Sequence, residues 1–477
     1  MSAAALENGP STGGLAYREF FSDPQLIVLI DEAIANNREL RILNEEVRIA
    51  RNEVMARRGA YLPFLNIGGS AELEKPSLFT PQGTVEDQLQ VVPGKNYPDP
   101  RPNFLGFINL NWEIDIWRQL RNARDAAQFR YFAAIARRNA QMTAIVAEVA
   151  SSYYELLSLD QKMAALDAII QLQENSMRFA QAAKEAGRGS ELAVQRFIAA
   201  VQNTRSEKAI IAQEVLQTEN RINSLLSRYP QPISRTGQAF MNIAFPILQV
   251  GVPSELLLNR QDIMEAEREL MAAGLDVQVA RAEFLPKVGL RAGVGLEAFD
   301  TGYFFQTPES LIYGVAGDLV APLVNKAAIR AEFQNANARQ LQALYTYQQR
   351  LVDAFVEVVN SMNRLQNYQQ SLQYELDRLH ALEASVEVAS NLYQNARVEY
   401  IEVLLSQRDL VDARLSVIDS KREQLLASVS TYRALGGGWR RSSGRFIAPP
   451  DAAQQAEIIP APPLQLAPAD ADRAEGN

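Results

Sequence analysis

Two stretches of this chain contain neither proline nor glycine over a length that no ordinary globular domain accommodates. They run from Asp115 to Ala186 and from Asn325 to Ala396, and both are rich in helix-forming residues. Each predicts one helix of about seventy residues, on the order of 100 Å long. Because such a helix cannot bury itself in a compact core, the sequence predicts a coiled coil or an array of helices.

The last part of the chain carries a periodicity that fits this prediction. Apolar residues recur there at every seventh position, which is typical of a sustained coiled-coil contact. The residues with this spacing are Leu404, Val411, Ile418, Leu425 and Tyr432.

The chain is also internally duplicated. A helix, a proline and a strand follow one another around Pro63 and again around Pro286, 223 positions later. Further along, matched residues such as Arg121 and Arg330 lie 209 positions apart. The second copy has therefore lost about fourteen residues between these landmarks, and we place the loss in the loop between its strands.

Four segments of about ten residues alternate between apolar and polar or small side chains, which predicts strands with two different faces. They are predicted at about 63–73, 103–114, 287–297 and 311–320. The loop within the first pair, Glu74–Arg101, is rich in Pro and Gly and is longer than its counterpart, Ala298–Ser310. In the third segment, Arg291 and Glu297 fall on the polar face.

Each copy thus predicts a helix, a strand, a loop, a strand, a long helix, a tight turn and a shorter helix. The helices at about 31–61 and 190–227 together match the long helix in length, so we expect them to stack end to end beside it. The predicted division is an N-terminal extended or equatorial segment (1–30), repeat 1 (31–228), a linker or equatorial segment (229–255), repeat 2 (256–439) and a Pro/Ala-rich disordered tail (440–477).

Composition argues against several classes of function. The net charge of −9 and the pI of about 5.1 argue against binding to nucleic acid. The chain has no cysteine and one histidine, His380 in a helical context, so thiol chemistry, Cys/His metal sites and a Ser-His-Asp triad are not expected. No nucleotide-binding or nucleophile-elbow motif stands between a strand and a helix. We expect no enzyme and no cofactor.

No stretch of eighteen apolar residues predicts a transmembrane helix, and the N-terminus as given carries no secretory signal. Either the protein is not exported, or its signal has been removed. The two-faced strands fit transmembrane β-strands as well as a soluble sandwich. In lipid, four strands cannot close a barrel and an open edge is not tolerated, whereas three copies would supply twelve strands. Phe104, Phe107, Trp112 and Tyr313 fit a membrane-interface girdle or ordinary core packing equally well.

Several segments resemble those of the TolC family of outer-membrane efflux proteins, in its multidrug-channel branch. NLNWEIDIWRQLRNARDAA is similar to the family's Trp-Glu-Ile-Asp-Leu-Trp segment after the second strand. GVPSELLLNRQDI is similar to its Leu-Pro-Ser-Leu-Leu-x-x-Arg-Pro-Asp-Ile segment, with Gln261 in place of the usual proline. YIEVLLSQRDL and YRALGGGW resemble the closing segments of the second repeat, and the resemblance extends from about Leu26 to Trp439.

This resemblance implies an α+β membrane protein that forms a homotrimer. Four strands from each protomer would complete a twelve-stranded barrel in the outer membrane, continuous with a long periplasmic α-helical barrel. Substrates would leave through this duct of a tripartite efflux pump or a type I-like secretion system, driven by an inner-membrane pump through a periplasmic adaptor. The family branch often has a lipidated N-terminal cysteine, so an anchor lies outside this form of the chain or the barrel suffices.

The resemblance also places the periplasmic tip at about 186–194 and 395–405, where the duct must close. Leu405 stands where the family commonly has a gating aspartate, and Ala193 replaces a usual acid, so we expect closure by Leu405 and Glu402. The full set of gate candidates is Tyr393, Glu402, Leu405 and Asp409. The adaptor-contact candidates are Gly187, Arg188, Gly189, Ser190, Val398, Glu399 and Tyr400. Helix capping and turn chemistry explain the glycines equally well.

Two other functions compete with the export duct. An elongated periplasmic coiled-coil scaffold without a pore would use the strands as minor packing elements, and it would be recovered without detergent. An enzyme that uses carboxylates on its helices would need a compact pocket, which helices of about seventy residues make difficult to build.

Overall fold

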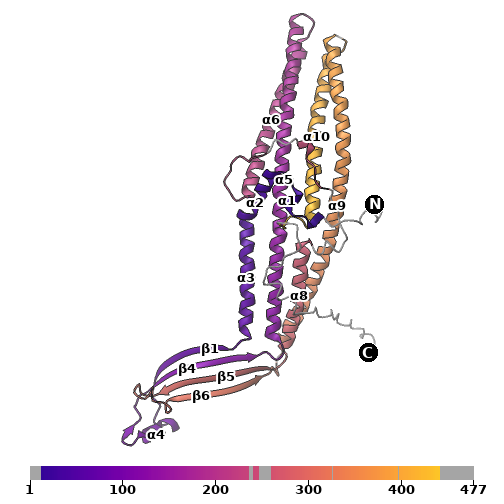
Figure 1. Cartoon of the computed structure of the whole chain (residues 1–477). Coiled ribbons are helices and arrows are strands. Elements are labelled where there is room, and N and C mark those ends of the chain that lie inside the picture. The colour runs from indigo at the N-terminus through magenta and orange to yellow at the C-terminus, as the bar shows by residue number, and fades with distance from the viewer. Residues whose placement is uncertain (1–11, 236–239, 247–258, 325, 396, 441–477) are drawn as a thin grey trace, which may run out of the picture.

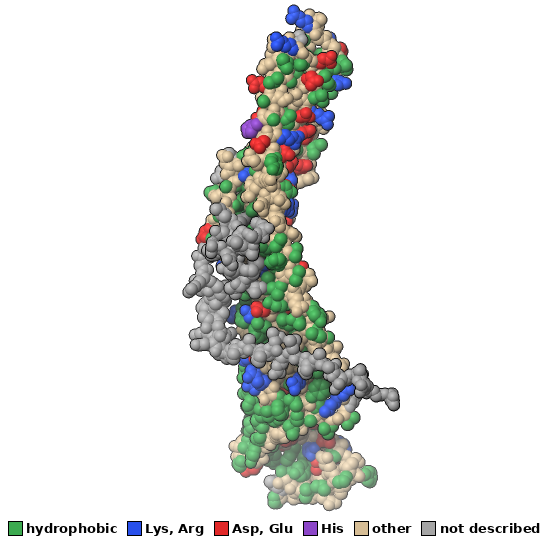
Figure 2. All heavy atoms as spheres, turned by 90° about the vertical axis from the view of Figure 1, so that its right-hand side faces the viewer, with side chains coloured by type: hydrophobic (Ala, Val, Ile, Leu, Met, Phe, Trp, Pro, Cys, Tyr) green, Lys and Arg blue, Asp and Glu red, His purple; other side chains and the backbone are tan. Residues whose placement is uncertain are grey.

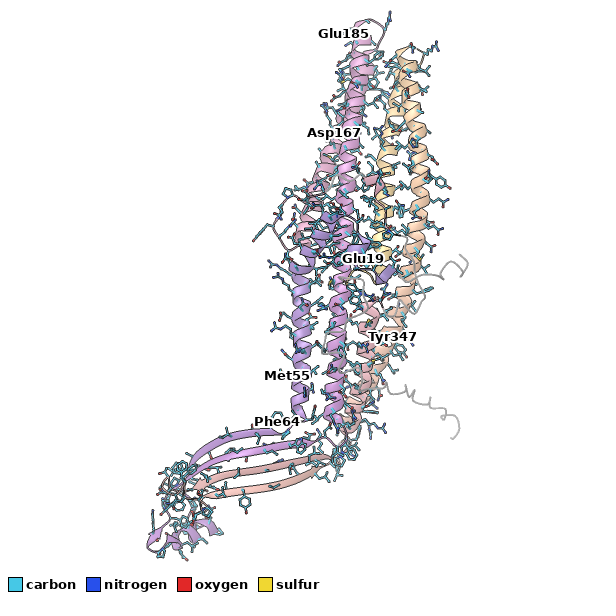
Figure 3. The ribbon with its side chains drawn as sticks, viewed as in Figure 1. Glu19, Met55, Phe64, Asp167, Glu185 and Tyr347 are labelled. Carbon is cyan, nitrogen blue, oxygen red and sulfur yellow. The ribbon has the colours of Figure 1, made fainter. Side chains whose placement is uncertain are left out.

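The computed structural model describes residues 12–235, 240–246, 259–324, 326–395 and 397–440. Two long helices, α5 (Gln119–Glu185) and α9 (Ala327–Gln394), run through most of the molecule (Figure 1). A four-stranded sheet continues from one end of the helices, and two helical turns form the other end. The long helices that the sequence predicted are therefore present. In Figure 3, Phe64 and Glu185 mark the two ends of the helical part.

The shorter helices pack in line along the two long ones. Helices α3 (Arg38–Ala60) and α6 (Glu191–Leu225) both pack against α5, while α8 (Gln261–Ala282) and α10 (Tyr400–Ala434) both pack against α9. Helix α5 also contacts α8 and α10, so the helices form one curved layer. The predicted end-to-end stacking is confirmed, since Asn37 Nδ2 donates to Leu225 O at 2.9 Å where α3 meets α6.

The helix predicted at about 31–61 is wrong as a single element. It consists of α2 (Pro24–Asn36) and α3, which are separated by Asn37 with an extended backbone (φ −54°, ψ 126°). The Asn37 side chain accepts a hydrogen bond from Leu40 N at 3.2 Å and so caps α3. An asparagine that caps the following helix breaks the chain direction without a proline or glycine.

The middle of the molecule contains its main hydrophobic core. The short elements η2 (Thr12–Gly14), α1 (Tyr17–Phe20) and η3 (Phe240–Asn242) lie there against α2, α5 and α10. The rings of Phe20 and Tyr432 stack with centroids 4.0 Å apart, and Tyr432 Oη donates to Leu15 O at 2.8 Å. Tyr432 is the last residue of the predicted heptad pattern, and Val411, Ile418 and Leu425 are also buried.

The sheet joins the two repeats. Its strands are β1 (Phe64–Glu74), β4 (Arg101–Ile114), β5 (Lys287–Ala298) and β6 (Leu311–Val320), in that order and all antiparallel. Strand β4 of the first repeat pairs with β5 of the second. Strands β1 and β6 are the two edges, and each lacks a strand partner on its outer side within the described chain.

The register separates polar from apolar side chains across all four strands. Ile67, Ile108, Val294 and Tyr313 are in register on one face, whereas Glu113 pairs with Gly289 on the other. The polar face carries cross-strand contacts, among them Arg291 with Asp318 at 3.4 Å and Asn103 with Glu297 at 2.9 Å. The alternation in the sequence thus corresponds to two faces of one sheet.

Phe107 lies on the polar face of this sheet, because it is opposite Gly295 and Gly68. Its ring covers Gly68, where a Cβ atom would lie 2.7 Å from Phe107 Cζ. The position of Phe107 therefore excludes it from an aromatic girdle on the apolar face. Phe104, Trp112 and Tyr313 have the parity of the apolar face.

The segment Glu74–Arg101, predicted as a loop, contains regular structure. It includes α4 (Pro81–Gln88) and a small hairpin of β2 (Gln90–Val92) and β3 (Lys95–Asn96). Thr80 caps α4 and Pro81 occupies its first turn, a combination that predicts a helix start. Arg101 forms ion pairs with Glu74 and Glu86 and so links α4 to the end of β1 and the start of β4.

Among the described helices, none is long and apolar enough to cross a membrane.

The stacking of α8 and α10 depends on an almost buried arginine. Arg260 donates to Ala434 O at 2.9 Å and pairs with Asp262 and Glu357, both at 2.7 Å. Glu357 also pairs with Arg433 at 2.8 Å. Burial raises the pKa of Glu357, but Arg260 and Arg433 outweigh this effect and hold the pKa below its usual value.

We expect Glu357→Gln to lower the apparent midpoint of thermal unfolding at pH 7 by the equivalent of about 2 kcal/mol, because Arg260 loses a counter-charge. The low folded-state pKa gives stability that is present above the unfolded pKa and is lost as the pH falls through the folded value. The difference between variant and wild type should therefore shrink as the pH falls below the usual pKa range of a glutamate carboxyl. Circular dichroism of the detergent-solubilised protein checks this, with the exposed acid variant Glu387→Gln as control. Equal midpoints at pH 7 would contradict it.

Candidate gate at the tips of the helical hairpins

The turn between α5 and α6 is built from glycine and capping interactions. Gly187 has φ +71°, and the backbone N–H groups of Gly187 and Arg188 donate to Lys184 O and Ala183 O. This is the pattern of hydrogen bonds that closes a helix before a left-handed residue. Ser190 Oγ then accepts from Ala193 N at 3.2 Å and begins α6.

The turn between α9 and α10 ends its helix in a different way. Asn395 donates from its backbone and its side chain to Asn391 O, and Arg397 N donates to Leu392 O at 2.9 Å. Glu399 precedes α10 without a side-chain capping bond among the described residues. Both tips are therefore tight turns between antiparallel helices, as the sequence predicted.

A hydrophobic cluster joins the two hairpins just behind these turns. Ala180, Val194, Phe197 and Val403 are its buried members, from α5, α6 and α10. Partly buried residues from all four helices pack around them, namely Met177, Ile198, Ala389, Tyr393, Tyr400 and Leu404. The two hairpins of one protomer thus touch through apolar side chains at the end where a duct would have to close.

The four gate candidates occupy two different environments. Tyr393 lies in the cluster, with its ring 5.4 Å from that of Phe179 in an edge-to-face arrangement. Burial raises the pKa of the Tyr393 phenol, and the nearby Tyr400 adds to the shift. Glu402, Leu405 and Asp409 are exposed on α10, and their spacing of three and four residues places them on one helix face.

The adaptor-contact candidates gather at the tips, but they are not equally accessible. Gly187, Arg188, Ser190 and Glu399 are exposed. Gly189 and Val398 are partly buried, and a Cβ atom on Gly189 would lie 2.8 Å from Lys184 N. Tyr400 packs in the cluster with Tyr393, so the structure gives it a packing contact.

One polar contact between the hairpins was not predicted from the sequence. Gln407, on α10, is 2% exposed, and its Nε2 donates to Ser176 Oγ on α5 at 2.7 Å. Its Oε1 is buried without a hydrogen-bond partner among the described residues. A glutamine between the apolar positions Leu404 and Val411 is the signal that could have marked this site, since polar residues in a coiled-coil core fix its pairing.

The described residues contain no group of three or more His, Cys, Asp or Glu side chains placed to hold a metal ion. His380 is exposed on α9, and its Nδ1 lies 3.9 Å from Glu383 Oε2.

Comparisons with known proteins agree with this geometry. The family model for outer membrane efflux proteins matches residues 29–228 and 252–437, which is most of the chain. The match covers both repeats, and it favours the export duct over a scaffold without a pore. The members of this family are transport channels.

Individual relatives cover almost the whole chain. The cation efflux system protein CusC of Escherichia coli O6:H1 is 28% identical over 440 residues, 92% of this chain and 90% of that protein. The pyoverdine export outer membrane protein OpmQ of Pseudomonas putida is 29% identical over 425 residues, 89% of this chain and 88% of that protein.

A solved structure of CusC is similar to this chain with a TM-score of 0.79 and 26% identity, and covers 91% of this chain and 96% of its own. The fold is therefore that of the outer-membrane channels, as the sequence predicted. The chain belongs to the outer membrane efflux protein family and is an outer-membrane efflux channel.

Proposed function

We propose that three copies of this chain assemble into a closed duct that passively conducts substrates out of the periplasm. The observation that best supports this proposal is the open sheet. Its edge strands β1 and β6 each have no strand partner on their outer side within the described chain. Unpaired edges are not tolerated in lipid, and β6 of one protomer can pair with β1 of the next. Three sheets would supply the twelve strands that a barrel of this kind needs.

The edges of the helical layer support the same assembly. Large apolar side chains are exposed along α3 and along α9, which form its two sides in the half nearest the sheet. Figure 2 views the α9 side, and Figure 3 labels Met55 on α3 and Tyr347 on α9. The exposed residues are Ile42, Ile49 and Met55 on α3 and Tyr345, Val352 and Phe355 on α9. Contact between the α9 side of one copy and the α3 side of the next would bury both rows.

The apolar face of the sheet would then contact lipid, and the polar face would line the lumen. We expect Val315→Arg to destabilise the assembled barrel by roughly 2–4 kcal/mol, the cost of a cation on the lipid face near mid-membrane. Gly314→Arg is the matched control, because Gly314 has the opposite parity and open space around its Cβ position. Resistance of the assembled protein to dissociation by heat in detergent measures both. Equal loss in the two variants would contradict the assignment of faces.

We further propose that the exposed face of α10 narrows the duct at the tip. Bulky apolar and acidic side chains from three protomers would converge there, with Leu405 and Glu402 closest to the turn. Tyr393 and the Gln407–Ser176 contact would hold each pair of hairpins together in the narrow state. Asp409, two turns further along α10, would extend the same face toward the wider part of the duct.

Glu402→Ala combined with Leu405→Ala should raise the single-channel conductance in planar bilayers, because the narrowest ring loses its bulk and charge. The matched control is Glu214→Ala with Leu216→Ala, which removes the same residue types from α6 at a distance of about 35 Å from its turn. Conductance that stays unchanged in the tip variant would rule out these two residues as the gate and leave the duct itself intact.

The exposed tips fit a periplasmic adaptor through which an inner-membrane pump would act. Arg188 and Glu399 are exposed at the two turns and carry opposite charges, so an adaptor with complementary charges could recognise both. A photo-crosslinking amino acid at position 188 should capture an adaptor in the native host, whereas the same probe at Leu216 should not. Mass spectrometry identifies the product, and equal labelling from both positions would argue against a tip-specific contact.

The relatives differ in the substrates that their names give, which include cations, solvents and pyoverdine.

A further inference from the structure

A groove of about 620 Å³ lies where the second repeat passes from helix to strand. It is formed by the end of α8 and the start of α9, and its residues are Arg281, Phe284, Leu285, Arg330, Phe333 and Gln334. The rings of Phe284 and Phe333 meet edge to face at 6.1 Å and form an apolar floor. The groove therefore combines two guanidinium groups with an apolar surface that is open to the exterior of the protomer.

The guanidinium groups of Arg281 and Arg330 form no ion pair with a carboxylate of the described chain, and both residues are exposed. Several other arginines near a helix end do have such partners, for example Arg121 with Asp115 and Arg260 with Asp262. Two positive charges that line one groove and have no paired carboxylate repel each other and favour an anion between them.

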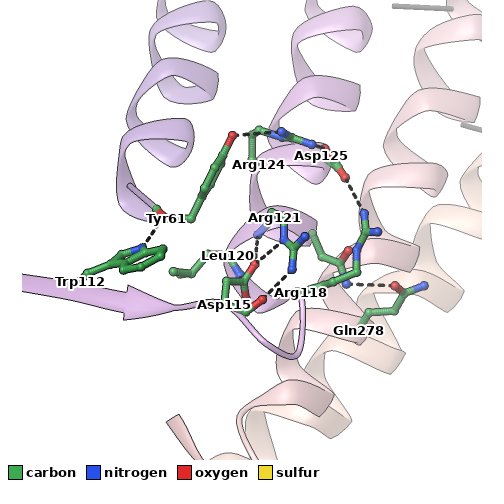
Figure 4. A network of polar contacts seen from close by, with 10 residues as sticks. Tyr61, Trp112, Asp115, Arg118, Leu120, Arg121, Arg124, Asp125 and Gln278 are labelled. Carbon is green, nitrogen blue, oxygen red and sulfur yellow. Dashed lines mark hydrogen bonds and ion pairs between the residues drawn. The ribbon is translucent and has the colours of Figure 1, made fainter. Parts of the chain in front are cut away.

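At the equivalent junction of the first repeat, carboxylates of the chain itself lie beside the arginines. There the Asp115 carboxylate accepts from Leu120 N at 3.1 Å and from Arg121 N and Nε at 2.9 and 3.1 Å (Figure 4). A second acid, Asp125, pairs with Arg124 and lies 3.9 Å from Arg118. In the first repeat, Asp115 and Asp125 thus neutralise the arginines at this junction.

The second junction has the same framework without those acids. At the spacings of the duplication, Arg330 corresponds to Arg121, while Phe333 and Gln334 correspond to Arg124 and Asp125. The connection from β6 to α9, residues 321–326, reads APLVNK and contains no Asp or Glu. Helix α9 also has no acid in its first turn and no side-chain cap among the described residues. The second repeat has kept the arginine and lost the carboxylate.

The surroundings of this groove indicate which anion fits it. Leu319 and Val320, at the end of β6, and Leu323 and Val324, in the connection, are all strongly exposed apolar residues. The groove therefore lies at the border between the apolar face of the sheet and the polar helices. A small hydrated anion gains nothing from Phe284 and Leu285, whereas an amphiphile gains from both halves of the site.

We propose that this groove binds a phospholipid of the leaflet nearest the helices. The phosphate takes the place that the Asp115 carboxylate has in the first repeat, between Arg281 and Arg330, and an acyl chain lies along Phe284, Leu285 and Phe333. Two observations support this proposal. The two guanidinium groups, which have no ion pair, complement the charge of a phosphate, and the floor of the groove is apolar. It rests on the placement of the sheet in the outer membrane.

The test uses the full-length channel, delipidated in detergent and then incubated with mixed micelles of palmitoyl-oleoyl phosphatidylglycerol. Native mass spectrometry counts the lipids that remain bound to each protomer. We expect retention by the wild type and a loss of about tenfold in affinity for Arg281→Gln with Arg330→Gln. Val324→Asp, which places a carboxylate six residues before Arg330 as Asp115 stands before Arg121, should lower retention to a similar extent. The control Arg339→Gln, on an arginine of α9 paired with Glu332, should retain the lipid.

Three results would overturn the proposal. Equal retention by wild type and both groove variants would mean that the lipid binds elsewhere. Displacement by millimolar inorganic phosphate would identify a site for a soluble anion. Dissociation of the assembly in the double arginine variant, without lipid binding in the wild type, would show that a second copy fills the groove. Conductance is measured on the same samples, so a channel that conducts normally but binds no lipid contradicts this inference and leaves the proposed duct standing.

Discussion

The pairing of β4 with β5 is the contact on which the rest of the structure depends, because it joins the strands of the two repeats into one sheet. A slip of one residue would move every apolar side chain to the other face. The observed register places Trp112 opposite Leu290 and Glu113 opposite Gly289, so both repeats present their apolar residues on the same side. A sheet with one apolar face and two open edges leaves apolar side chains and backbone hydrogen-bonding groups without partners in its own protomer. Lipid can cover the apolar face, and further copies of the chain can pair with the edges.

The order of the strands also sets the order of the helices. Strands β1, β4, β5 and β6 connect to α3, α5, α8 and α9, and these four helices lie side by side in the same sequence. Further from the sheet, α6 and α10 take the places of α3 and α8. The breaks between the stacked helices fall at one level, where Phe20, Tyr432 and their neighbours form the main core. Two hairpins of unequal helices can therefore build a wall that is continuous along its length.

The duplication repeats the framework more faithfully than it repeats the polar chemistry. Both repeats have a proline before their first strand and an arginine in the first turn of the long helix or next to it, at Arg121 and Arg330. Among the described residues, only the first repeat pairs its junction arginines with carboxylates, at Asp115 and Asp125, so only the first neutralises its own arginines. At the opposite end, the two turns are closed by different interactions, with Gly187 in one and Asn395 in the other. Equivalent positions in the two repeats can thus serve different partners.

The sequence by itself determined the lengths of the two long helices, the four strands with their faces and the position of the tips, because periodicity, proline and glycine act locally. It also indicated candidate tip residues through a resemblance, and the structure places them near the two turns. Only the tertiary structure decided that Asn37 divides a helix, that Phe107 covers Gly68, that Gln407 meets Ser176 and that Arg281 shares a groove with Arg330. Most of these features depend on contacts between segments that are far apart in the sequence, and local sequence patterns do not predict such contacts.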